Sequence, residues 1–180
     1  MLALGAAACQ PSSSSTVRRF ETDLVAFDYP AHWKTLSEIW PSYEPGRNPE
    51  LDADEVGSVA DTGTSTRWEK YTTSFTVLVK ELPPGASLEV VFEQTYHNIP
   101  LLEPISEGAT TVDGMTAYEK VYREPHGEPW FQIRDIWLEA DGRIYVLSCW
   151  ALPDNFEAAQ ADFDIIINSF EVKSVRSRSR

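Results

Sequence analysis

The segment from residue 130 to residue 170 constrains the fold more than any other part of the sequence. Two runs rich in β-branched and aromatic residues, 130–139 and 143–152, flank the pair Asp141-Gly142. Both residues of this pair tolerate positive φ angles, which predicts a tight turn between two antiparallel strands. Apolar side chains then recur at spacings of three and four: Phe156, Ala159, Phe163, Ile166 and Phe170. This spacing predicts an amphipathic helix packed against the sheet.

The predicted start of that helix is Asp154, which follows Pro153. Asp154 is expected to be the N-cap, and Glu157, three residues later, to complete a capping-box-like pair with it. Asp162 and Asp164 are expected on the outer face of the helix.

The middle of the chain predicts further strands and one more helix. Strands are expected at 24–29, 73–80 and 115–123, with a short strand near 56–61 inside the irregular segment 41–66. Ser87 can N-cap a helix that runs to about His97, because its hydroxyl can accept from the free N–H groups of the first turn. The residues expected on the packing face of this helix are Leu88, Val91, Thr95 and Ile99.

The late strands carry apolar residues on both faces, which is typical of a sheet covered on both sides. The predicted fold class is therefore α+β, with an antiparallel β-sheet and helices packed on its faces in an α/β/α sandwich. A chain of 180 residues indicates one domain, expected at 20–174. Residues 175–180 are expected to form a basic disordered tail.

The charge distribution argues against nucleic-acid binding. The net charge is −13, and all 28 acidic side chains lie between Glu21 and Glu171. Several of the basic side chains lie instead at the two ends of the chain: Arg18, Arg19, Arg176, Arg178 and Arg180. The negative field of the body repels phosphate backbones, so no nucleic-acid partner is expected.

The N-terminus resembles the lipobox of bacterial lipoproteins, in which small residues precede a cysteine. Here Ala6-Ala7-Ala8 precede Cys9, and a serine-rich segment follows. The resemblance implies cleavage before Cys9, acylation of this residue with fatty acids such as palmitate, and an extracytoplasmic protein lipid-anchored to the cell membrane. Residues 1–19 would then be a truncated signal and flexible tether. The alternative is an unprocessed cytosolic terminus, because the stretch before Cys9 lacks a basic region and is short for a signal peptide.

Membrane contact, if any, is expected through the lipid only, because no later run reaches the ~18 apolar residues of a spanning helix. Catalytic motifs are not found: no nucleophile elbow, phosphate-binding glycine loop or zinc-protease motif is present. His32, His97 and His126 lie in separate predicted elements. Cys149, inside an apolar run, is expected to be a buried and inert thiol. No cofactor is expected.

Two sets of residues are weak candidates for a site. Four acidic residues could supply oxygens to Ca²⁺, although acidic loops are usually only solvated: Asp52, Asp54, Glu55 and Asp61. Aromatic residues that exceed the needs of a core could contact a ligand or partner, and the alternative is ordinary packing: Trp40, Trp68, Tyr122, Trp130 and Trp137. Trp130 is the one expected to be partly exposed.

Several short motifs together resemble the PsbP-like superfamily. They are Phe27-Asp-Tyr-Pro30 with Trp33, Gly142-Arg-Ile-Tyr-Val-Leu147, Ala151-x-Pro153, Phe156, Phe163 and Ile167-Asn-Ser-Phe170. The resemblance spans about residues 22–173. It implies an antiparallel sheet between helices and a role in binding or stabilising partners. It carries over no catalytic residue.

These observations leave more than one hypothesis for function. The first is a non-enzymatic, membrane-tethered extracytoplasmic binding or scaffolding domain, expected to be a monomer, with an unknown protein or small-molecule partner. The second is a small hydrolase or isomerase that uses a carboxylate-lined pocket. A third is a cytosolic assembly factor. A deep pocket with converging carboxylates would favour an enzyme, and a shallow aromatic surface would favour binding.

Overall fold

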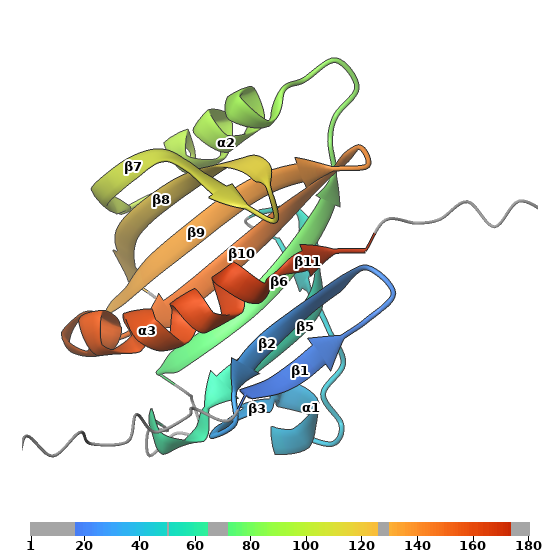
Figure 1. Cartoon of the computed structure of the whole chain (residues 1–180). Coiled ribbons are helices and arrows are strands. Elements are labelled where there is room, and N and C mark those ends of the chain that lie inside the picture. The colour runs from blue at the N-terminus through green and yellow to red at the C-terminus, as the bar shows by residue number, and fades with distance from the viewer. Residues whose placement is uncertain (1–16, 50, 65–71, 126–129, 174–180) are drawn as a thin grey trace, which may run out of the picture.

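An eight-stranded antiparallel sheet dominates the fold (Figure 1). The computed structural model describes residues 17–49, 51–64, 72–125 and 130–173. The path of the sheet is β3-β5-β6-β10-β9-β8-β7, and β4 pairs with β5. Its strands are β3 (Trp33–Thr35), β4 (Arg47–Asn48), β5 (Ala53–Asp61), β6 (Thr73–Glu81), β7 (Glu103–Val112), β8 (Met115–Pro125), β9 (Trp130–Ala140) and β10 (Arg143–Ala151).

A second antiparallel sheet brings the two ends of the described chain together. Its order is β1 (Val17–Glu21), β2 (Val25–Pro30) and β11 (Glu171–Val172). The Arg19 guanidinium joins its two outer strands across β2, at 3.1 Å from Asp28 Oδ1 and 2.9 Å from Glu171 Oε2. Residues 17–19, expected to belong to the flexible tether, are therefore part of the folded chain.

The two faces of the large sheet are covered differently. Helix α2 (Leu88–His97) covers one face, while α3 (Pro153–Ser169) and the small sheet cover the other (Figure 1). The remaining helices are short: α1 (Leu36–Ile39) and a 3-10 turn at Thr62–Thr64. The predicted sandwich is thus confirmed only in part, because strands dominate and one outer layer contains a sheet beside its helix.

The hairpin and the last helix form as the spacing predicts. Asp141 and Gly142 have φ angles of 52° and 74° in the turn between β9 and β10. The apolar stripe is buried: Phe156, Ala159, Phe163, Ile166 and Phe170.

The predicted cap of α3 is wrong. Leu152 is the N-cap and makes no side-chain cap bond, and Asp154 lies inside the first turn. The helix begins at Pro153 because proline lacks an N–H and its fixed φ suits the first helical position. The two expected outer-face acids contact basic groups: Asp162 lies 3.5 Å from His32, and Asp164 lies 3.1 Å from Arg134.

Helix α2 is N-capped by Ser87, which accepts from Val90 N at 3.4 Å, as predicted. Its packing face differs from the predicted one, since the fully buried residues are Leu88, Phe92 and Tyr96. Val91, Thr95 and Ile99 are only half-buried. The two aromatic rings decide the orientation, because both pack on the buried Trp137 ring at centroid distances of 5.8 Å.

Two strands differ from expectation. The short strand predicted near 56–61 is the nine-residue β5, which begins at Ala53 and has a register shift between Glu55 and Gly57. Strand β7 has no counterpart among the predicted strands. Most of its residues are exposed at the edge of the sheet. Because neither side of the strand is buried over most of its length, its sequence lacks the alternation of apolar and polar residues that predicts a strand.

Candidate functional site

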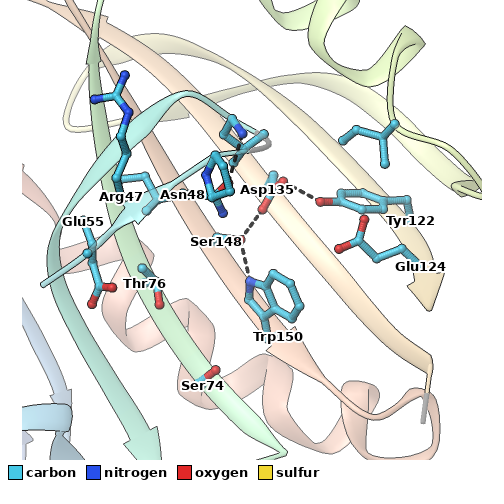
Figure 2. A pocket seen from close by; sticks show the side chains of 15 residues that line it. Arg47, Asn48, Glu55, Ser74, Thr76, Tyr122, Glu124, Asp135, Ser148 and Trp150 are labelled. Atoms are coloured by element: carbon cyan, nitrogen blue, oxygen red, sulfur yellow. Dashed lines mark hydrogen bonds between the residues drawn. The ribbon is translucent and has the colours of Figure 1, made fainter. Parts of the chain in front are cut away.

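A cavity of about 330 Å³ lies on the α2 face of the large sheet, beneath the loop that carries β4 (Figure 2). Five adjacent strands, β5, β6, β10, β9 and β8, each contribute a polar side chain to its wall: Glu55, Thr76, Ser148, Asp135 and Tyr122. The loop wall includes Arg47 and Asn48, and the apolar part includes Leu78, Ile99 and Trp150. We call this the Asp135 cavity.

Strand alternation explains why these polar groups face the cavity. Asp135 shares a face of β9 with Ile133 and Trp137, both of which belong to the α2-side core. Ser148 lies on the same face of β10 as Val146. Residues two apart on a strand point to the same side of the sheet, so each polar side chain interrupts a buried apolar row.

Asp135 is the centre of the cavity's hydrogen-bond network and is 0% exposed. Its Oδ2 accepts from the Tyr96 hydroxyl at 2.6 Å and from the Tyr122 hydroxyl at 2.9 Å. Its Oδ1 accepts from the Ser148 hydroxyl. The network extends one step further, because Trp137 Nε1 donates to Tyr96 and Trp150 Nε1 donates to Ser148, both at 2.8 Å. Figure 2 shows the Tyr122, Ser148 and Trp150 bonds.

Burial raises the pKa of Asp135, and the Ser148, Tyr96 and Tyr122 hydroxyls oppose that rise by stabilising the ionised form. Among the described residues, no lysine or arginine forms an ion pair with this carboxylate. Two lysines, Lys80 and Lys120, lie over aromatic rings instead. Lys80 Nζ is 4.7 Å from the Trp137 ring centroid, and Lys120 Nζ is 5.2 Å from that of Tyr96. Asp135 is thus a carboxylate held mainly by hydroxyl donors.

The loop over the cavity is tied down at several points. Arg47 Nη1 pairs with Asp54 at 3.0 Å, and its other terminal nitrogen pairs with Asp52. Glu55 N donates to the Gly46 carbonyl at 2.8 Å, and Leu51 N donates to Asn48 Oδ1 at 2.9 Å. These bonds fix one wall of the cavity against β5.

Of the four weak calcium candidates, Asp52 and Asp54 share a partner, while Glu55 and Asp61 have other partners. Asp52 and Asp54 are engaged by Arg47, while Glu55 accepts from the hydroxyls of Tyr43 and Ser58. Asp61 accepts from Gly63 N at 2.8 Å. Within the described ranges, no group of three or more His, Cys, Asp or Glu side chains could hold a metal ion.

The aromatic candidates separate into different environments. Tyr122 lines the cavity, whereas Trp40 is half-buried at the end of α1 and Trp137 is fully buried in the core. Trp130 is 38% exposed at the start of β9, in agreement with the expectation for its exposure. Trp68 lies outside the described residues.

Sequence reasoning missed Asp135, Ser148 and Trp150. One signal was available for Asp135. Asp135 is an acid that interrupts the apolar row of alternate residues Phe131, Ile133 and Trp137, on a strand that is apolar on both faces.

The other chemistry-bearing residues lie elsewhere. Cys149 is fully buried, and burial raises the pKa of its thiol, which fits the predicted inert role. His32 contacts Asp162 on α3, and His97 ends α2. His126 and Cys9 lie outside the described residues. No described helix is both long and apolar enough to cross a membrane.

Comparisons with known proteins give relatives of the same fold. The solution structure of cyanobacterial PsbP (CyanoP) from Synechocystis sp. PCC 6803 matches with 18% identity and a TM-score of 0.56, over 92% of this chain and 98% of that one. The LpqN structure, described as involved in cell envelope biogenesis of Mycobacterium tuberculosis, matches with 14% identity and a TM-score of 0.61, over 82% of each chain. The Saccharomyces cerevisiae Ran-binding protein Mog1p matches with 11% identity and a TM-score of 0.56, over 89% of this chain and 97% of that one.

A search of curated protein sequences found no match. The family model for PsbP-like proteins matches residues 6–172, nearly the whole chain. The sequence motifs that resemble this group lie within that match, and the structural neighbours share the fold. The chain belongs to the PsbP-like protein family.

Proposed function

We propose that this protein is a non-enzymatic binding protein whose Asp135 cavity holds a small polar ligand. The observation that carries the proposal is the position of Asp135, a fully buried carboxylate in the wall of a cavity of about 330 Å³. Ligand sites are typically concave, mainly pre-formed and equipped with a few fixed polar groups. Asp135 meets this description because the sheet and the hydroxyl donors hold it in place.

The hydrogen bonds of the cavity support binding over catalysis. Acid–base catalysis needs a titratable group within reach of the proton it moves. The described partners of Asp135 are hydroxyls, and neither His32 nor His97 lines the cavity.

One observation favours the hydrolase or isomerase alternative. Glu55 and Glu124 join Asp135 in the cavity lining, so the pocket is lined by carboxylates. If the protein turned over ester or amide substrates and Glu124→Gln abolished that turnover, the enzyme would be the better conclusion.

A thermal-shift screen with a pocket-filling variant tests the binding proposal. Ser74 lines the cavity from β6, opposite Trp150 in the neighbouring strand, so Ser74→Leu places an apolar side chain there. We expect small polar compounds that raise the Tm of the natural protein to leave the Tm of Ser74→Leu unchanged.

The matched control is Ser106→Leu on the exposed edge strand β7, which should respond as the natural protein does. Compounds that stabilise Ser74→Leu and the natural protein equally would place binding elsewhere. A screen of chemically diverse polar compounds without any stabilising member would count against a small-ligand function.

A protein partner is the second candidate. The structural neighbour Mog1p is described as Ran-binding, and this chain exposes Leu101 (73%) and Ile105 (49%) beside the free edge of β7. The same edge carries Pro104, a bulge and two glutamates, features that discourage pairing with another strand. We therefore expect a monomer of 20.3 kDa by light scattering, and a dimer would contradict this expectation.

We also propose that Cys9 is acylated and tethers the domain to the extracytoplasmic face of the cell membrane. The small residues before Cys9 and the serine-rich segment after it support this, as does the cell-envelope role in the description of LpqN. Mass spectrometry of the membrane fraction should find an N-terminal peptide that begins at a lipid-modified Cys9. An intact Met1 terminus in the soluble fraction would contradict the tether.

A further inference from the structure

We propose that the Asp135 cavity binds an organic ammonium cation, whose N–H group donates to Oδ1 of Asp135. This inference rests on the proposed binding function and names its ligand class. Three observations carry it: the acceptor capacity of Asp135, the balance of charge around the cavity, and the apolar part of the cavity wall.

Asp135 has room for one more hydrogen bond. An ionised carboxylate offers about four acceptor sites on its two oxygens. Oδ2 accepts from Tyr96 and Tyr122, whereas Oδ1 accepts only from Ser148 among the described side chains. Tyr96 approaches Oδ2 from α2 and does not line the cavity, whereas Ser148 does. Each oxygen accepts from one cavity-lining hydroxyl, Tyr122 at Oδ2 and Ser148 at Oδ1, and the second bond from Tyr96 leaves Oδ1 as the oxygen with spare capacity.

Among the described residues that line the cavity, the charge of Asp135 is not matched by a cation. Its side-chain partners are hydroxyls, and the arginine that lines the cavity, Arg47, is engaged by Asp52 and Asp54 at the rim. Buried charge is costly unless it is paired, so a ligand of positive charge gains from this environment where an anion would not. A neutral ligand could fill the space but would leave the charge of Asp135 uncompensated.

The apolar part of the wall suits the body of such a ligand. Trp150 lines the cavity with its indole ring, which is fixed by the bond from Nε1 to Ser148, and Leu78 and Ile99 add aliphatic surface. An ammonium group near an indole face gains further stabilisation from the ring electrons. Ser148 thus links the aromatic wall directly to the carboxylate.

Benzylamine and benzyl alcohol are suitable probes, because they have nearly the same shape and differ in the charged group. The readout is the NMR signal of the Trp150 indole N–H in the full chain, assigned with Trp150→Phe. We expect benzylamine to shift this signal and to bind at least about tenfold more tightly than benzyl alcohol, which corresponds to about 1.4 kcal/mol. Asp135→Asn should remove this preference. Asp154→Asn, an exposed acid on α3 over the opposite face, should keep it.

The outcomes separate this inference from the proposed function. If both probes bind equally and Asp135→Asn changes neither, the cavity binds ligands but the cation class is wrong. If neither probe perturbs Trp150, the cation class is wrong, and the thermal-shift screen decides separately whether the cavity binds another small polar ligand.

A measurement on the natural protein covers the case in which Asp135→Asn does not fold. Benzylamine affinity should fall as the pH is lowered and Asp135 becomes protonated, while benzyl alcohol affinity stays level. Among the described residues, Tyr96 and Tyr122 donate to Asp135, and Glu55, Glu124 and Arg47 line the same cavity. Lys120 lies over the Tyr96 ring and Lys80 over the Trp137 ring. Equal pH profiles for the two probes would overturn the cation class.

Discussion

Asp135 shows how one polar residue can organise a buried face. An isolated carboxylate in this position would cost several kcal/mol, and hydrogen bonds from surrounding donors offset much of that cost. The donors come from three elements: Tyr96 from α2, Tyr122 from β8 and Ser148 from β10. The carboxylate therefore fixes α2 on the sheet and at the same time fixes a wall of the cavity.

The raised pKa of Asp135 predicts the pH dependence of Asp135→Asn. Because its folded-state pKa lies above the unfolded value, the natural protein loses stability as the pH rises from the unfolded pKa through the folded one. The Asn variant has no such loss. We expect the difference in unfolding free energy to move in favour of the variant as the pH rises from about 4 towards neutral.

Urea unfolding of both proteins across this pH range measures the difference. Glu38 provides an internal comparison, because its hydrogen bond with Arg18 lowers its pKa to about 2. Its contribution is lost as the pH falls towards 2, in both proteins alike, and it cancels in the difference. A difference that is constant with pH would show that the pKa of Asp135 is not raised.

At the scale of elements, the register shift in β5 lies where the small sheet packs against this strand. The register of β5 against β6 shifts between Glu55 and Gly57, and a Cβ at Gly57 would lie 2.5 Å from Cε1 of Phe20. Phe20 cannot easily move away, because its ring stacks on Phe27 at 4.8 Å. The absence of a side chain at Gly57 is what allows β1 and β2 to pack on the large sheet here.

Gly57→Ala is therefore expected to destabilise the protein by about 1–3 kcal/mol, the usual cost of overpacking. The matched control is Gly108→Ala on β7, where no atom lies within 4 Å of the added Cβ, so little or no loss is expected. In a double-mutant cycle measured by urea unfolding, Phe20→Leu should recover part of the Gly57→Ala loss. Strictly additive effects would mean that Phe20 does not cause the penalty.

The helices show where local patterns succeed and fail. The stripe from Phe156 to Phe170 is long and continuous, so its period alone identifies α3 and its buried face. In α2, two adjacent faces carry apolar residues, and the aromatic partners on the sheet decide between them. Trp137 selects the face of Phe92 and Tyr96 over that of Val91 and Thr95. That choice depends on a contact some forty residues away along the chain, which no local pattern contains.

At the scale of the whole molecule, two cores share one sheet. The α3-side core includes Trp33 and Phe163, whose rings meet edge to face at 5.9 Å, and the α2-side core surrounds Trp137. The first and last strands meet in the small sheet through surface ion pairs such as Arg19–Glu171. Because exposed ion pairs contribute little, the packed cores rather than these pairs hold the ends of the chain together.

A comparison of two variants tests whether the packed cores or the ion pairs hold the two ends of the chain together. Phe163→Ala removes a fully buried ring and should cost about 3–5 kcal/mol of unfolding free energy. Arg19→Ala removes exposed pairs with Asp28 and Glu171 and should cost less than about 1 kcal/mol. If both variants lose a similar amount of unfolding free energy in denaturant, the ion pairs as well as the core hold the two ends of the chain together.

The sequence by itself determined the features that depend on short-range periodicity. These are the hairpin at Asp141-Gly142, the strands near it, α3 with its apolar stripe, the Ser87 cap and the motifs of the PsbP-like family. Only the tertiary structure decided the site. Glu55, Thr76, Tyr122, Asp135 and Ser148 come together because strands distant in the sequence are adjacent in the sheet. Their adjacency depends on strand order and register, which are set by long-range packing, and a local pattern cannot carry that information.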